Sequence, residues 1–186
     1  MGAMNTHPLP LPGLLRIDTS PSVDSRGEFV RVSCSDELST IRPDLMFAQV
    51  NLSTTLMRGS VRGLHYQVGP AWEAKMIRCL RGRVFDVAVD LRADSSTFLQ
   101  WHAIELDASV QSQVYIPEGF AHGFQALTDD VQLLYFHTTA WRPDCERRLH
   151  FNAPRLAIRW PLPVTSVSEA DASAPALDQN FRGVAP

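Results

Sequence analysis

Long apolar runs are missing from this sequence of 186 residues. No segment reaches the length of a transmembrane span, and none has the short apolar core of a signal peptide, so we expect no membrane association. A basic excess is missing as well, because 17 lysines and arginines stand against 20 aspartates and glutamates, for a formal net charge of −3. Binding to nucleic acid therefore has no electrostatic support. Any phosphate group would have to be held by a few individually placed arginines.

Cysteine is scarce and follows no pattern. Cys34, Cys79 and Cys145 are an odd number and include no CxxC spacing. This argues against a disulfide framework and against a structural zinc site. We therefore expect a protein of the reducing cytoplasm.

Residues 1–13 are predicted to form a disordered or extended lead-in. Residues 1–4 resemble the scar of an expression tag before a native start at Met4. Prolines then alternate with leucines, which excludes a helix, and we expect order to begin at Leu14. No internal repeat or change in composition marks a domain boundary after that point. Residues 14–186 are predicted to form a single domain with a substantial core.

Short runs of strand length dominate the sequence, and glycine, proline or aspartate separates nearly all of them. Only residues 35–41 resemble a helix, which Ser35 would cap and Pro43 would end. Many evenly spaced strands indicate an all-β fold, a jelly-roll barrel with few short helices that can hold one ligand inside. The expected strands cover residues 14–17, 29–33, 47–53, 75–80, 84–91, 101–106, 113–116 and 131–138.

Residues 84–92 alternate with a period of two. The odd positions from 85 to 91 are apolar, whereas the even positions include Asp86 and Asp90. One face of this strand should therefore be core and the other polar. Residues 81–83 should join it to the preceding strand as a tight hairpin, because Gly82 can adopt a positive φ.

Two segments each place a histidine among small, apolar and aromatic residues. Residues 62–67 read Arg-Gly-Leu-His-Tyr-Gln, and residues 117–124 read Pro-Glu-Gly-Phe-Ala-His-Gly-Phe. The second resembles the later half of the cupin signature, which supports a cupin-like barrel. However, Gln67 replaces the second histidine of an HxH pair, and Ala126 stands where cupins often have asparagine. Too few ligands remain for zinc or iron, so we predict no metal site.

Four residues together indicate proton transfer next to a carbonyl group. His65 would act as base with Asp171 behind it, Lys75 would face the developing enolate oxygen, and Tyr135 would return a proton from the opposite face. Taken singly, Lys75 also fits an exposed lysine at a strand end, Tyr135 a half-buried core tyrosine, and a lone histidine a hydrogen-bonded core residue. The catalytic interpretation therefore depends on the four acting together.

Specific motifs run through nearly the whole chain. They are Gln49-x-Asn51-x-Ser53, residues 62–67, Lys75, Gly82-x-x-x-Asp86-Val87-x-Val89-Asp90-x-Arg92, residues 117–124 and Ser168-Glu169-x-Asp171. From about residue 14 to residue 178, the chain resembles the dTDP-4-dehydrorhamnose 3,5-epimerase family. The resemblance implies a jelly-roll homodimer that needs no metal or organic cofactor. Its substrate would be a nucleotide-linked 4-keto-6-deoxy-hexose.

The same resemblance implies a role for each matching residue. His65 would be the base, supported by Asp171, with Lys75 near the sugar carbonyl and Tyr135 as the acid. The 4-ketone acidifies the protons on C3 and C5, so a base on one face and an acid on the other give inversion. The expected substrate-binding residues are Arg62 at the pyrophosphate, Arg26 reaching the nucleotide across the dimer, and Gln49, Asn51, Gln67, His122 and Trp141 around the pocket.

Two positions depart from the family pattern. Arg31 stands where the family often has glutamate, at the nucleotide end, and Trp141 replaces a tyrosine at the sugar end. We expect the bulkier Trp141 to restrict inversion to one centre, although it could also be a packing substitute. The alternatives are therefore epimerisation at C3 and C5, epimerisation at one of them, and a non-catalytic cupin that binds a sugar nucleotide.

Overall fold

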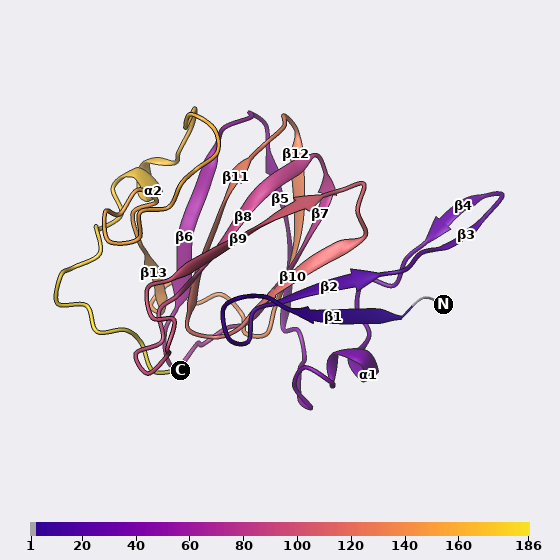
Figure 1. Cartoon of the computed structure of the whole chain (residues 1–186), viewed down its shortest axis with the longest axis horizontal. Coiled ribbons are helices and arrows are strands. Elements are labelled where there is room, and N and C mark those ends of the chain that lie inside the picture. Colours follow the sequence, from indigo (N-terminus) through magenta and orange to yellow (C-terminus); the bar gives the residue numbers. More distant parts are fainter. Residues whose placement is uncertain (1–2) are drawn as a thin grey trace.

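The computed structural model describes residues 3–186, so Met1 and Gly2 of the expected tag scar lie outside it. Two antiparallel sheets face each other, as expected for an all-β jelly roll (Figure 1). The six-stranded sheet has the order β1 (Met4–Pro8), β2 (Leu15–Thr19), β10 (Ser112–Ile116), β7 (Lys75–Arg81), β12 (Val131–His137) and β5 (Gln49–Thr55). The five-stranded sheet has the order β13 (Glu146–Arg148), β6 (Val61–Gln67), β11 (Phe120–Ala126), β8 (Arg83–Asp90) and β9 (Trp101–Asp107).

Few residues lie outside these sheets in regular structure. A hairpin of β3 (Ser22–Asp24) and β4 (Gly27–Phe29) projects from the body of the molecule (Figure 1). Two short helices, α1 (Ser35–Leu38) and α2 (Glu169–Ala172), complete the described chain. Neither approaches the length and hydropathy of a membrane-crossing helix.

The core consists of three apolar layers. One layer lies between the two sheets, a second lies between the five-stranded sheet and the C-terminal segment, and a third lies between the six-stranded sheet and the segment around α1. Each sheet is therefore buried on both faces over part of its area. Typical members are Ile77, Val84, Phe124 and Leu133 of the first layer, Val89, Leu156 and Leu177 of the second, and Ile17, Leu38 and Met76 of the third.

The period of two in β8 has a different meaning from the one predicted. Val87 and Val89 pack beneath the C-terminal segment, outside the sheet. Ala88, which shares the parity of the aspartates, packs between the sheets. Asp86 and Asp90 are 1% and 0% exposed, so the face predicted to be polar is turned inward. An alternating pattern cannot distinguish water from a polar interior.

The predicted hairpin at Gly82 is wrong. Gly82 does have a positive φ of 73°, but β7 pairs with β10 and β12, whereas β8 pairs with β9 and β11. The turn therefore passes from one sheet to the other. The strands β6 and β11 were not predicted at all, because the glycines within them interrupt the strand pattern.

The N-terminal region also differs from the prediction. Residues 4–8 form strand β1, paired with β2, and Leu11 is 2% exposed, so order begins before Leu14. The expected strand over residues 29–33 is reduced to Phe29 at the end of β4. Helix α1 ends at Leu38, and its N-cap is Cys34 rather than Ser35. The C-terminal segment covers the five-stranded sheet and brings Asp171 inward.

Candidate active site

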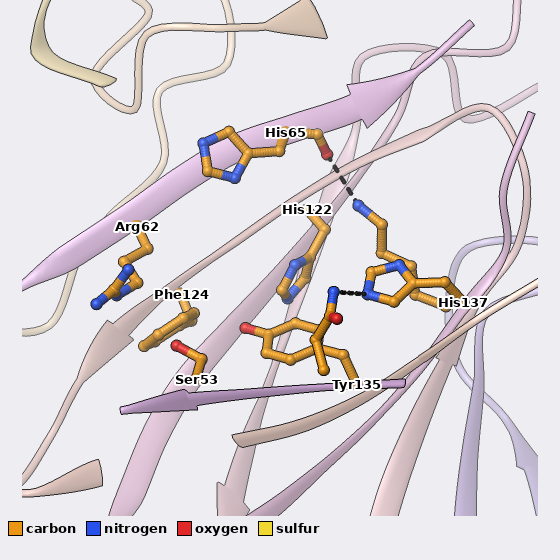
Figure 2. A pocket seen from close by; sticks show the side chains of 9 residues that line it. Ser53, Arg62, His65, His122, Phe124, Tyr135 and His137 are labelled. Carbon is orange, nitrogen blue, oxygen red and sulfur yellow. Dashed lines mark hydrogen bonds between the residues drawn. The ribbon is translucent and has the colours of Figure 1, made fainter. Parts of the chain in front are cut away.

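A cavity of about 220 Å³ lies between the two sheets. Polar side chains from both sheets line it, and Figure 2 shows the rings of His122 and Tyr135 pointing into it. The six-stranded sheet contributes Asn51, Ser53, Lys75, Tyr135 and His137, and the five-stranded sheet contributes Arg62, His65, His122 and Phe124.

Two further hollows adjoin this cavity. One, of about 320 Å³, shares His65 and Lys75 with it and extends to Trp141. The other, of about 580 Å³, shares Arg62 and His65 with it and extends to Arg148. His65 is thus common to all three spaces, which together can accept a ligand much larger than a single sugar ring.

A β-bulge places Arg62 and His65 in the same cavity. Residues three apart in a regular strand face opposite sides of a sheet. Here His122 pairs with His65, but Gly123 pairs with Gly63, so β6 contains one extra residue. The two glycines permit a close approach, because a Cβ added at Gly63 would lie 2.7 Å from the Cα of Gly123.

Asp171 holds His65 from behind. Its Oδ1 lies 2.7 Å from His65 Nε2, and the same oxygen accepts a hydrogen bond from Arg148 Nη1 at 2.8 Å. The backbone N–H of Gly63 donates to Oδ2 at 3.1 Å. The side chain of Ser168 caps α2 by accepting from the Asp171 N–H at 3.1 Å. The predicted pair of His65 and Asp171 is therefore present across 106 residues of sequence.

These contacts fix the protonation of the pair. Burial alone would raise the pKa of Asp171, but the hydrogen bond and charge of His65, with the Gly63 N–H, hold that pKa well below its usual range. An ionised carboxylate only accepts hydrogen bonds, so His65 Nε2 must donate. The Nδ1 atom of His65 then carries the free lone pair that a base requires.

Lys75 lies in a buried charge network that the sequence did not reveal. Its Nζ lies 2.9 Å from Glu73 Oε1, with the two side chains 9% and 7% exposed. The other oxygen of Glu73 lies 3.0 Å from His137 Nδ1, and His137 Nε2 lies 3.3 Å from Asn51 Nδ2. Burial would raise the pKa of Glu73, but His137 and Lys75 lower it to about 2. Lys75 Nζ also lies 3.5 Å from the carbonyl oxygen of His65 (Figure 2).

Tyr135 lies beside a second pair of histidine and carboxylate. His122 Nε2 is 2.8 Å from Asp86 Oδ2, and the rings of His122 and Tyr135 meet edge to face with centroids 5.9 Å apart. Burial, and then the charge of Asp86, raises the pKa of Tyr135 well above its ordinary value. The phenol is therefore neutral and able to donate a proton.

The glutamines and Trp141 lie around the mouth of the site. Gln67 Oε1 accepts from the backbone N–H of Arg142 at 2.7 Å, while its buried Nε2 has no partner among the described residues. Gln49 Oε1 accepts from the backbone N–H of Trp141 at 2.9 Å. The Trp141 ring is 55% exposed, and its Nε1 lies 3.3 Å from Glu146 Oε2. Trp141 lines the hollow of about 320 Å³ and not the cavity that contains Tyr135.

The two predicted arginines occupy different places. Arg62 lines the cavity, where its Nε donates to Thr55 Oγ1 at 2.9 Å and its Nη2 donates to the carbonyl of Thr54 at 3.0 Å. Arg26 lies at the tip of the β3–β4 hairpin, with its side chain 88% exposed and paired with Asp24 at 2.6 Å. Arg26 lines neither the cavity nor the two hollows that adjoin it in the described chain.

Sequence reasoning missed several residues of the site. Glu73 and His137 lie in apolar surroundings without a motif, and Asp86 was assigned only to the polar face of its strand. Glu146 and Arg148 lie in a charged stretch that suggests only surface. The one available sequence signal was for His137, which lies two residues after Tyr135 along β12. Residues two apart in a strand share a face.

The described residues contain no cluster of three or more histidine, cysteine, aspartate or glutamate side chains placed to hold a metal ion. Each of the three cavity histidines instead directs one nitrogen to its own carboxylate.

Comparison with known proteins identifies the family. The family model described as dTDP-4-dehydrorhamnose 3,5-epimerase matches residues 8–179. The chain belongs to this family. It is 38% identical over 173 residues to the 3,5-epimerase of Salmonella typhimurium, which covers 91% of this chain and 93% of the relative. It is also 38% identical to a dTDP-4-dehydrorhamnose 3-epimerase of Streptomyces niveus, over 92% of this chain and 83% of the relative.

A solved structure agrees with this assignment. The 3,5-epimerase of Legionella pneumophila, determined in complex with dTDP-4-keto-L-rhamnose, superposes with a TM-score of 0.87. It is 36% identical, and the match covers 92% of this chain and 91% of that one. The epimerase described here is accordingly an isomerase with the cupin fold of its family.

Proposed function

We propose that this epimerase inverts a dTDP-4-keto-6-deoxy-hexose at C3, C5 or both, by removing a proton on one face and returning one on the other. The proposal rests on the observation that two side chains of one cavity come from different sheets. His65, backed by Asp171, comes from the five-stranded sheet, and the neutral Tyr135 comes from the six-stranded sheet, yet both line one cavity. A flat enolate between the sheets would meet a base on one face and an acid on the other.

The proposed chemistry conserves atoms and charge. His65 Nδ1 takes the proton from the carbon next to the ketone, and the electron pair of the broken C–H bond moves into the enolate. The negative charge that gathers on the C4 oxygen is stabilised by Lys75. The enolate carbon then takes the Tyr135 hydroxyl proton on its opposite face. Solvent removes a proton from His65 and returns one to Tyr135 before the next turnover.

Glu73 pairs with Lys75 when no substrate is bound but leaves Lys75 able to turn to the substrate. The carboxylate is held by Lys75 on one oxygen and by His137 on the other. When the ammonium group turns to the substrate oxygen, His137 still satisfies Glu73. Buried charge of this kind is costly only when it is left unpaired.

The remaining predicted residues bind substrate in this proposal. Arg62 holds the pyrophosphate through a planar, permanently charged guanidinium group. Gln67 has a buried amide nitrogen with no partner among the described residues, and this nitrogen can donate to a ligand oxygen. The residues around the sugar and nucleotide are Gln49, Asn51, His122 and Trp141. No metal or organic cofactor takes part, and the three unpaired cysteines fit a cytoplasmic enzyme.

A homodimer completes the proposed site. Arg26 is remote from the cavity of its own chain, on a projecting hairpin that also exposes Val23 and Phe29 by 71% and 65%. The edge strand β5 exposes Val50 and Leu52 by 54% and 60%. A second copy would cover such apolar side chains and bring its Arg26 to the nucleotide.

Subunit mixing tests the dimer. His65→Asn and Arg26→Ala chains should each be impaired alone. A mixed dimer contains one site in which an intact His65 meets an intact Arg26 from the partner, so mixing should restore activity. A monomeric mass by analytical ultracentrifugation, or no restoration after mixing, would contradict the shared site.

Proton exchange tests the chemistry. In heavy water, the parent protein should incorporate deuterium at the inverted carbon. Tyr135→Phe should still exchange that proton through His65, with retention of configuration and little inversion. Tyr115→Phe is the matched control, because Tyr115 is buried in the outer layer of the six-stranded sheet. Bound substrate without any exchange in the folded parent would favour a non-catalytic sugar-nucleotide-binding cupin.

The position of labelling distinguishes the two kinds of epimerase. Both a 3,5-epimerase and a 3-epimerase are among the relatives, at the same 38% identity. Label at both carbons would indicate the former reaction, and label at one carbon would indicate the latter.

A further inference from the structure

Arg148 contacts the carboxylate that supports the proposed base. Arg148 pairs with His65 in the register between β13 and β6, so the two side chains lie on neighbouring strands. Arg148 Nη1 and His65 Nε2 lie 2.8 Å and 2.7 Å from one and the same atom, Oδ1 of Asp171. The second Arg148 nitrogen, Nη2, lies 3.1 Å from Glu146 Oε1.

We propose that Arg148 is a positioning residue that acts through Asp171 to fix the tautomer of His65 and to extend its range as a base toward lower pH. The inference rests on the proposed role of His65 in proton abstraction. Arg148 does not line the cavity that contains Tyr135.

The first part of the argument concerns the hydrogen-bond roles at Oδ1. An arginine only donates and cannot lose its charge in a protein. Its contact therefore makes Oδ1 an acceptor at every working pH. His65 Nε2 must then carry a hydrogen, and Nδ1 is left as the basic nitrogen. Without Arg148, the Gly63 N–H would be left, besides His65, to hold the Asp171 carboxylate by a hydrogen bond. Oδ1 could then turn away from His65, and an imidazole without this acceptor could place its hydrogen on either nitrogen.

The second part concerns charge. The guanidinium group of Arg148 opposes the positive charge that His65 acquires when it takes a proton, whereas Asp171 favours that charge. The side chains of His65 and Arg148 are 34% and 33% exposed, so water screens the repulsion in part. Arg148 thus offsets some of the attraction that Asp171 exerts on a positively charged imidazole.

Other charged groups also lie around His65. Lys75 on β7 adds positive charge near the His65 carbonyl, and Glu146 on β13 reduces the effect of Arg148. The other titratable or charged side chains that line the cavity and hollows around His65 are Arg62 and Tyr66 on β6, His122 on β11, Tyr135 and His137 on β12, and Glu73 before β7, with Asp86 on β8 behind His122. Arg148 is the one cation among them that contacts the Asp171 carboxylate in the described chain.

A series of side-chain contacts connects Arg148 to Trp141 at the mouth of the site. Glu146 holds Arg148 with Oε1 and Trp141 Nε1 with Oε2. Side-chain contacts thus join, one after another, Trp141, Glu146, Arg148, Asp171 and His65. The carboxylate of Glu146 holds the Arg148 guanidinium at Asp171.

The experiment compares Arg148→Gln, Arg148→Lys and Arg147→Gln in the full-length protein. Arg147 is the matched control, because it lies on the same strand and its guanidinium donates to the backbone oxygens of Asp144 and Glu146. Proteins labelled with nitrogen-15 in histidine are examined without substrate, and the two-bond proton–nitrogen spectrum reports the His65 tautomer. His65→Asn identifies the His65 signals by their loss.

In the parent and in Arg147→Gln, His65 should be in the Nε2–H form. Arg148→Gln should give a mixture of both tautomers. Its exchange activity in heavy water should fall by about tenfold or more in kcat, within the range seen when partners of functional histidines are removed. The acid limb of its pH–rate profile should move to higher pH by up to about one unit. Arg148→Lys should restore a substantial part of the rate, because it returns the charge.

Three results would overturn the inference. The first is an unchanged tautomer and pH profile in Arg148→Gln. The second is a loss confined to dTDP affinity or KM, which would make Arg148 a ligand-binding residue. The third is unfolding of both Arg148 variants, which would make its role structural. Because the spectrum is recorded without substrate, it remains decisive even if the parent shows no epimerase activity, and that outcome would contradict the proposed function instead.

Discussion

Replacing Asp171 by asparagine tests how the base is supported. The substitution keeps the shape of the side chain but removes its charge. The carboxylate now accepts from His65 and Arg148 on Oδ1 and from the Gly63 N–H on Oδ2, and its side chain is only 4% exposed. Because donors face both oxygens, the asparagine NH2 group must meet a donor in either orientation.

The cost can be worked out from these contacts. The amide oxygen should turn to the charged Arg148, which leaves the Gly63 N–H facing another donor, at about 1–3 kcal/mol of folding stability. In the transition state, the imidazolium of His65 also loses its carboxylate. A charge-assisted hydrogen bond of this kind contributes about 3 kcal/mol, or a roughly 150-fold slower reaction. The variant should therefore be slow but measurable, whereas His65→Asn should abolish exchange and leave dTDP affinity nearly unchanged.

The assay is deuterium incorporation from heavy water, with thermal unfolding measured in parallel. Asp144→Asn is the control, because Asp144 forms an exposed surface pair with Arg142. If Asp171→Asn were as inactive as His65→Asn while remaining folded, Asp171 would take a direct part in proton transfer. If His65→Asn also lost dTDP binding, the separation between the base and the nucleotide-binding residues would be wrong.

Three further predictions concern other parts of the site. Because the pKa of Glu73 is lowered from 4.5 to about 2, its ionisation stabilises the fold above pH 4.5 and ceases to do so as pH falls toward 2. The stability advantage of the parent over Glu73→Gln, measured by urea unfolding, should therefore shrink by about 3 kcal/mol across that window. A constant difference would refute the network. Prolonged chelation should leave activity intact, and restoration of a chelated, inactive enzyme by one added metal would contradict this. Trp141→Tyr should raise the rate of labelling at the slower of C3 and C5, and equal, rapid labelling of both carbons in the parent would make Trp141 a packing residue.

The sequence predicted the layout of the fold better than its connections. Runs of strand length located β5, β7, β8, β9, β10 and β12 to within a few residues, because local propensity and alternation determine them. The turn at Gly82 was misassigned because a positive φ fits a hairpin and a crossing between sheets equally well. Strand β1 was missed because its pairing with β2 supplies order that the proline-rich sequence does not suggest.

The residues of the site likewise fall into those that the local sequence predicted and those that only tertiary contacts bring in. Motif and chemistry pointed to His65, Lys75, Tyr135 and Asp171, and the structure places all four around connected spaces. Partners supplied by tertiary contacts could not be predicted. Glu73 reaches Lys75 from a loop, and Arg148 reaches Asp171 from a three-residue edge strand, so no local period marks either residue.

Asp86 illustrates how one buried carboxylate can serve two neighbouring groups. Alternation along β8 placed it on a face that would be solvated in an open sheet, but the second sheet closes over that face. Inside, Asp86 Oδ2 directs His122, while its Oδ1 has no partner among the described residues. Its negative charge adds to burial in raising the pKa of Tyr135. The same charge that orients His122 therefore disfavours tyrosinate, which keeps the proposed acid protonated until an enolate is present to accept its proton.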